Sequence, residues 1–94
     1  MAIGLLSLHV HIPGCTSLKA KRSRLKPLLA RLHREFNISV AEMDLQDSWQ
    51  EAILACVLVS NDRNHIQQSL QKIIRWVETS WPDVTLLDQQ TEVI

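Results

Sequence analysis

Apolar residues recur at every second position along residues 2–12, which is the pattern of a half-buried β-strand. One phase is apolar or small throughout, and the other turns polar toward its end. The first phase holds Ala2, Gly4, Leu6, Leu8, Val10 and Ile12, and the second holds Ile3, Leu5, Ser7, His9 and His11. Pro13-Gly14 ends the pattern. We therefore expect a strand over residues 2–12 with its apolar phase on a core.

Residues 17–36 carry apolar side chains at the 3.6-residue period of an α-helix. Ser17 is a suitable N-cap, and the helix should end near Asn37. Pro27 lies inside this segment and removes one backbone hydrogen bond, so we expect a kink there or a break in the first turns of the helix. The apolar stripe consists of Leu18, Leu25, Leu28, Leu29, Leu32 and Phe36.

The remaining pattern predicts three more strands and a second helix. Residues 38–44 and 51–60 read as strands, and the latter is apolar in both phases, which favours a central position. A helix follows the cap cluster 60–62 and ends near Ser80, before Trp81-Pro82. Residues 84–88 form a last strand, and residues 89–94 either continue it or fray. The order β-α-β-β-α-β predicts one α+β domain over residues 1–94 with a ferredoxin-like split β-α-β fold. It has a four-stranded antiparallel sheet with two helices on one face.

Composition adds a charge asymmetry to this outline. The net charge is zero, but residues 1–35 hold seven basic residues and one acid, whereas residues 36–94 hold three basic residues and nine acids. The difference, +6 against −6, indicates a molecule with a positive and a negative side. No apolar run is long enough to span a membrane, and the two cysteines form no disulfide framework. We expect a cytoplasmic protein.

The predicted first helix is the leading candidate for binding a polyanion. Its solvent-facing positions are strongly basic, and no acid precedes Glu35, so ion pairs at i,i+4 spacing are not expected to neutralise them. The central strands contain no aromatic residue, which disfavours base stacking on the sheet and favours phosphate contacts. A merely solvated basic face is the alternative. The candidate residues are Lys19, Lys21, Arg22, Arg24, Lys26, Arg31 and Arg34.

Other chemistry has weaker support in the sequence. His9, His11 and Cys15 could approach one another, but they lack a recognised metal-ligand spacing and a catalytic triad. Asp44, Asp47 and Glu51 fit turn and cap positions better than acid–base roles. With two glycines in the chain, no Gly-rich phosphate loop exists. We therefore expect a non-enzymatic protein without metal or cofactor.

Three blocks of sequence resemble the bacterial YlxP-like family, a small family of uncharacterised function. These blocks are HIPG-x-x-SLK-x-KR, N-x-SVAE-x-D-x-QD-x-WQ and the SND cap of the second helix, and the likeness spans roughly residues 3–80. The resemblance implies a ferredoxin-like α/β sandwich. Members are typically encoded beside translation factors and ribosome-binding factor A, which implies a role in ribosome assembly or RNA binding.

Two hypotheses of function and one of assembly follow. The first is an RNA-binding or ribosome-associated accessory protein that uses the basic helix. The second is a regulatory or scaffolding module of the same topology that binds a small ligand or a protein at a polar block. That block consists of Glu42, Asp44, Gln46, Asp47, Trp49 and Gln50. The sheet face away from the helices should be apolar, so we also expect a homodimer whose sheets pack face to face or pair edges, with His9 and His11 at its rim.

Overall fold

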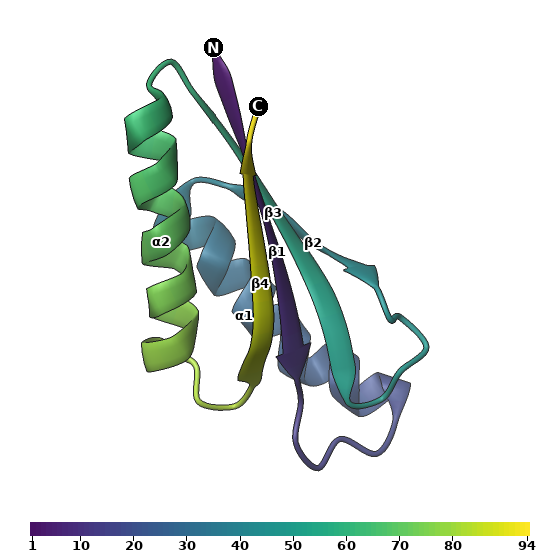
Figure 1. Ribbon diagram of the computed structural model, residues 1–94. Helices are drawn as coiled ribbons and strands as arrows, with labels where there is room; N and C mark the ends of the chain where they lie inside the picture. Colours follow the sequence, from purple (N-terminus) through teal and green to yellow (C-terminus); the bar gives the residue numbers. More distant parts are fainter.

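The computed structural model describes residues 1–94 and has the predicted order of elements. The chain folds as a ferredoxin-like α+β sandwich, with two helices and a four-stranded antiparallel sheet (Figure 1). The elements are β1 (Ala2–His11), α1 (Leu18–Phe36), β2 (Ser39–Asp44), β3 (Glu51–Ser60), α2 (Arg63–Ser80) and β4 (Thr85–Val93).

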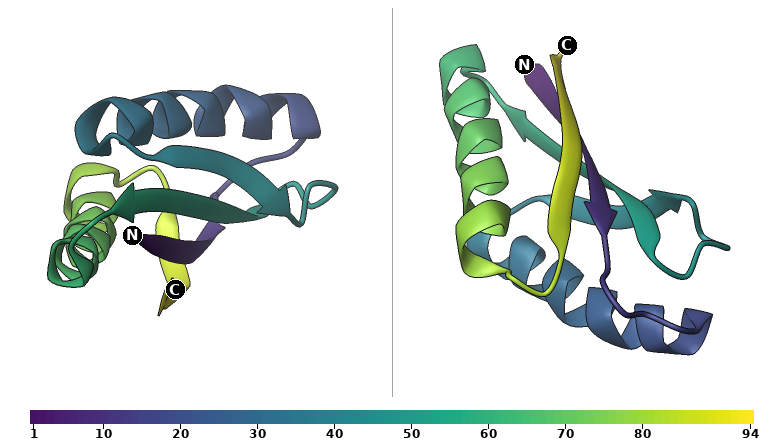
Figure 2. Two further views of the ribbon diagram at one scale, coloured as in Figure 1. Left: turned by 90° about the horizontal axis from the view of Figure 1, so that it is seen from above. Right: turned by 60° about the horizontal axis from the view of Figure 1, so that its bottom comes forward.

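The strands lie in the order β2-β3-β1-β4, so β3 and β1 are central and β2 and β4 are the edges. The predicted central position of β3 is confirmed. Both helices cover the same face, with their axes inclined to one another, and the opposite face is left uncovered (Figure 2). We call that uncovered side the open face. The molecule is elongated, with extents of 42 × 23 × 21 Å.

The last strand is longer than the stretch 84–88 that the sequence pattern predicts. β4 continues to Val93, and Ile94 still exchanges backbone hydrogen bonds with Ile3, at 2.9 and 2.8 Å. Of the two alternatives for residues 89–94, continuation of the strand is therefore confirmed. These residues pair along the edge of β1, so they do not fold across the open face.

α1 runs as one continuous helix through Pro27, and the expectation of a break is wrong. Pro27 and Ser23 are both exposed. The Ser23 carbonyl, which loses its helical donor, therefore lies on the solvent side, where water can replace the missing hydrogen bond. The helix begins at the predicted cap, where Ser17 Oγ accepts from Ala20 N at 3.0 Å, and it ends at Asn37 in the left-handed region.

The core lies between the sheet and the helices, and strict alternation along the central strands builds it. Along β1 and β3 every second residue is buried, and in β1 the buried phase is the predicted one. Gly4 marks the closest approach of α2, because a Cβ at this position would lie 2.5 Å from Cγ2 of Ile66. The buried side chains of the central strands are Ala2, Leu6, Leu8, Val10, Ala52, Leu54, Cys56 and Leu58.

Candidate nucleic-acid interface

α1 places its basic residues in three different environments. Its apolar stripe packs on the sheet through Leu25, Leu28 and Leu32, which are fully buried, and this fixes which side of the helix meets solvent. Four of the seven candidate residues are exposed and have no carboxylate within 4.0 Å. They are Lys19, Arg22, Lys26 and Arg34.

Lys21 does not face solvent, so the prediction that it contacts phosphate is wrong. Its side chain is 1% exposed, and its Nζ lies 2.7 Å from Glu42 Oε2 and 2.7 Å from the Leu45 carbonyl oxygen. The contact with Glu42 is a close ion pair whose angles depart from those of a good hydrogen bond. Lys21 lies four residues before Leu25, on the apolar stripe, and this spacing was a sequence signal for its burial.

Arg24 and Arg31 are held by neighbouring groups within the protein. The guanidinium of Arg24 donates to the carbonyls of Pro13 and Asp83, which ties α1 to the loops that follow β1 and α2. Arg31 pairs with Glu35 at 3.4 Å, one helical turn away, so the expectation of no i,i+4 partner fails at this position. Its Cζ also lies 6.0 Å from the ring centroid of Trp76.

The exposed cations form a stripe along α1. Lys19, Arg22 and Lys26 are three and four residues apart, which places them on one side of the helix over a length of about 10 Å. Beside this stripe, a shallow hollow of about 240 Å³ separates α1 from the edge strand β2. Most of its lining is apolar, although Arg22 and Lys26 border it, and the one carboxylate on it already pairs with Lys21. The lining residues are Arg22, Leu25, Lys26, Leu29 and Glu42.

The polar block proposed as an alternative site mostly serves to shape the β2–β3 loop. Glu42 holds Lys21, Asp44 Oδ1 accepts from Leu45 N at 2.7 Å, and Gln46 donates to the Glu42 carbonyl. Gln50 donates to the Cys15 carbonyl at 3.4 Å. Asp47 and Trp49 are the two members without such a bond, and they border an open hollow of about 400 Å³. The structure therefore commits four of the six residues to the loop.

The histidines and cysteines are not arranged for catalysis. His9 Nε2 lies 2.7 Å from Glu51 Oε1, whereas no group of three His, Cys, Asp or Glu residues converges as metal ligands would. Burial raises the pKa of the Cys56 thiol from 9.0 to about 12, so this group stays protonated at neutral pH and is a poor nucleophile. Cys15 is also buried and donates to the Ser17 carbonyl.

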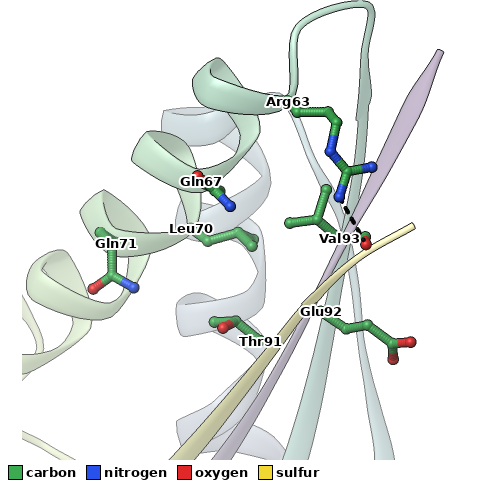
Figure 3. Close-up of a pocket in the computed structure, with 7 residues that line it drawn as sticks. All are labelled: Arg63, Gln67, Leu70, Gln71, Thr91, Glu92 and Val93. Atoms are coloured by element: carbon green, nitrogen blue, oxygen red, sulfur yellow. Dashed lines mark hydrogen bonds between the residues drawn. The ribbon is translucent and has the colours of Figure 1, made fainter.

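The largest hollow in the structure, about 530 Å³, lies between α2 and the edge strand β4 (Figure 3). Its lining is more polar than apolar, and the figure shows Glu92 pointing away from α2. Arg63 crosses one end and donates to the Val93 carbonyl at 3.4 Å. The hollow holds no nucleophile beside a base, so it offers no catalytic arrangement. The residues around it are Arg63, Gln67, Leu70, Gln71, Thr91, Glu92 and Val93.

Neither helix is both long and apolar enough to cross a membrane.

Comparison with known proteins identifies relatives without assigning an activity. Residues 3–91 match the family described as "Protein of unknown function (DUF503)". The chain is also similar to "Uncharacterized protein YlxP" of Bacillus subtilis (strain 168), at 32% identity over 90 residues. That alignment covers 96% of this chain and 97% of the relative. The resemblance to a YlxP-like family is thereby confirmed.

Proposed function

This chain belongs to the family described as protein of unknown function DUF503, and we propose that it is a non-enzymatic RNA-binding protein of the cytoplasm. The observation that carries the proposal is the stripe of Lys19, Arg22 and Lys26, extended by Arg34. These cations are exposed, lie on one helix and lack acidic partners. A folded protein gains little stability from such a concentration of like charge, whereas a polyanion would neutralise it.

The proposed contacts are to phosphates and carry no base specificity. The side chains of the three stripe residues project from one helix, as backbone-positioning contacts do. The open face offers little surface for base stacking, because its central strands contain no Phe, Tyr or Trp, and their only rings are His9 and His11 near one end. RNA with exposed, closely spaced phosphates fits this surface better than a particular sequence does.

Salt dependence tests the electrostatic part of the proposal. With three phosphate contacts, affinity for a structured RNA should fall by about 20- to 40-fold when salt rises about fourfold. Fluorescence anisotropy with a labelled RNA hairpin at two salt concentrations measures this. An affinity that hardly changes with salt would contradict phosphate binding.

A matched pair of charge reversals tests the location. The double variant Arg22→Glu/Lys26→Glu changes the net charge by the same amount as Lys72→Glu/Arg75→Glu on α2, and all four side chains are exposed. The α1 variant should weaken RNA binding by at least about tenfold and lower the salt slope by about two, because two phosphate contacts are lost. The α2 variant should change the affinity for RNA much less. Equal losses would show that only the total charge matters and that α1 is not the site.

The partner is best sought among RNAs and ribosomal particles, which the resemblance and the basic helix both favour. Capture from a cell lysate with and without nuclease separates an RNA-dependent partner from a protein that binds at Asp47 and Trp49. Capture that survives nuclease treatment and is abolished by Trp49→Ala would favour the alternative scaffolding function. Capture lost on nuclease treatment, with Trp49→Ala unaffected, would support RNA binding.

A further inference from the structure

We propose that the open face of the sheet is the interface with a second copy of this chain, packed face to face about a two-fold axis. This inference is independent of the proposed RNA binding, since α1 lies on the other side of the sheet. It begins with the unequal exposure of β3. Cys56 and Leu58 are buried under the helices, whereas Val57 and Val59 are 37% and 64% exposed on the open face.

Cross-strand pairing arranges the open face in rows that run across all four strands. Val57 pairs with Leu5, and this ridge continues to Ser39 on β2 and Glu92 on β4. Two residues along, Ala55 pairs with Ser7, and this row continues to Ala41 and Gln90. We call the first the Leu5–Val57 ridge and the second the Ser7–Ala55 furrow. A bulky ridge therefore lies directly beside a furrow of small side chains.

The furrow is a measurable hollow in the surface. A cavity of about 310 Å³ opens there, and more of its lining is apolar than polar. It is bordered by side chains of the ridge and the furrow on β3, β1 and β4. They are Leu5, Ser7, Ala55, Val57, Gln90 and Glu92.

One two-fold axis fits the ridge of each copy into the furrow of the other. The axis lies in the plane between the sheets, parallel to the rows and midway between ridge and furrow. It places each strand over its own counterpart, so that Val57 meets the second copy's Ala55 and Leu5 meets its Ser7. The same axis brings Ile53 of one copy over Val59 of the second copy. These two residues lie at the two ends of the apolar area on β3. Large side chains face small ones throughout the centre, as close packing requires.

Charge selects the same axis. On the open face of β4, the neutral residue Gln90 lies between Asp88 and Glu92. With the axis midway, Glu92 meets the Gln90 amide, which can donate to it. Centring the axis on the ridge would oppose Glu92 to Glu92, and centring it on the furrow would oppose Glu92 to Asp88. In both alternatives large side chains also face large ones, or small side chains face small ones. Both are therefore disfavoured by packing as well as by charge.

The size of the face sets the expected affinity. Four strands about 4.8 Å apart and four rows about 6.7 Å apart cover about 500 Å² per copy. The total of about 1,000 Å² is near the lower limit of specific interfaces, so we expect a dimer that dissociates in the micromolar range. Its helices lie on the two outer surfaces, and His9 and His11 of the two copies lie toward opposite ends of the interface.

Exchange of side chains between ridge and furrow tests the register. Ala55→Val overfills the furrow and Val57→Ala removes the ridge, so each should raise the dimer dissociation constant by about tenfold or more. The double variant Ala55→Val/Val57→Ala exchanges the two and should recover most of the affinity, because small again meets large. Sedimentation equilibrium on nuclease-treated protein, from low micromolar to millimolar concentration, measures all four proteins.

A charge on the ridge, with a matched control, tests the face itself. Val57→Lys should leave a folded monomer, whereas Gln68→Lys on the exposed side of α2 should dimerise as the wild type does. Circular dichroism checks that both are folded. A wild-type mass that stays monomeric over the whole range would overturn the proposal. So would a dimer that survives Val57→Lys, or single variants that dimerise as well as the wild type.

Discussion

The two faces of the sheet differ in what covers them far more than in what they are made of. In β3 the helix-facing phase contains Leu54, Cys56 and Leu58, and the open phase contains Ile53, Val57 and Val59. Both phases are aliphatic, yet the first is almost wholly buried and the second is partly or largely exposed. Burial in this fold is therefore decided by helix placement, and strand composition alone does not reveal it.

The covered face also contains the one charged side chain that is fully buried. Lys21 lies on the buried side of α1, with Glu42 and the Leu45 carbonyl as its partners. On the open face the comparable pair, His9 and Glu51, is about one-third and two-fifths exposed. An ion pair shielded from water depends on both partners, whereas one in contact with water depends on them much less. The contrast between the two faces can be tested by substitutions.

The largest effect on the free energy of unfolding is expected when Glu42 is removed. Glu42→Ala leaves the buried Lys21 ammonium with a single carbonyl partner, so the free energy of unfolding should fall by about 3 kcal/mol. The double variant Lys21→Met/Glu42→Gln removes the buried charge as well and should be closer to the wild type. Urea unfolding measures all three proteins. A loss below about 0.5 kcal/mol for Glu42→Ala, the size typical of exposed pairs, would contradict the importance of this contact.

The next effect depends on pH and concerns Cys56 on the covered face. Its thiol has a pKa of about 12 in the folded protein against 9.0 when unperturbed, so the folded state keeps a proton that the unfolded chain loses above pH 9. Stability from this group is thus complete below pH 9 and declines as pH rises toward 12. Linkage predicts that the stability difference between wild type and Cys56→Ala shrinks by about 2 kcal/mol between about pH 8 and pH 10.5.

The control for this pH effect is a nearby truncation that keeps the thiol. Leu58→Ala removes apolar contacts on the same strand and face but leaves Cys56 in place. Its stability difference from the wild type should stay constant over the same pH range. If it changed as much as that of Cys56→Ala, the thiol would not be the titrating group responsible.

A smaller loss is expected where α2 approaches β1. In Gly4→Ala the new methyl group would lie 2.5 Å from Ile66 Cγ2 and 3.0 Å from Leu58 Cδ2, in a fully packed core. Overpacking of this kind costs about 2 kcal/mol, and the reduced freedom of the unfolded chain offsets about 0.5 kcal/mol of it. We expect a net loss of about 1.5 kcal/mol in thermal or urea unfolding. An unchanged or raised stability would show that α2 can move away at little cost.

The smallest effect is expected on the open face. Val59 is 64% exposed, so Val59→Thr should change the free energy of unfolding of the monomer by less than about 0.5 kcal/mol. Measured at a concentration well below the dissociation constant of the proposed dimer, this variant provides the baseline for the three losses above. A loss comparable to that of Gly4→Ala would mean that another part of the protein already covers this face.

Much of the fold was predictable from the sequence because its signals are local. The alternation in β1, the apolar stripe of α2 and the cap at Ser17 are each set by neighbouring residues, and the structure has all three. The α2 stripe consists of Ile66, Leu70, Ile73, Ile74 and Val77, all of them buried. The continuation of β4 was not predictable, because residues 89–93 are mostly polar and become a strand by pairing with β1. The uninterrupted passage of α1 through Pro27 depends likewise on which side of the helix meets solvent.

The candidate interface was predictable in outline but not in membership. The basic character of α1 is a property of the sequence, and the burial of Lys21 was readable from its spacing to Leu25. The anchoring of Arg24 was not readable, because one of its acceptors, the Asp83 carbonyl, lies 59 residues away. The position of Trp76 beside Arg31 was not readable either, because it depends on how the two helices meet.

The pairing of β1 with β4 has a consequence for how the chain folds. Ile3 and Ile94 exchange backbone hydrogen bonds, and both chain ends lie together at the same end of the sheet (Figure 1). The sheet is therefore completed only when nearly the whole chain closes on itself, and such long-range closure makes folding slow. Joining the two ends by a short turn and opening the chain at the exposed Pro13-Gly14 turn would make β4 and β1 a hairpin and would keep the existing β2–β3 hairpin. That circular permutant keeps every strand contact of the sheet but turns its most distant one into a local one, so it should fold faster.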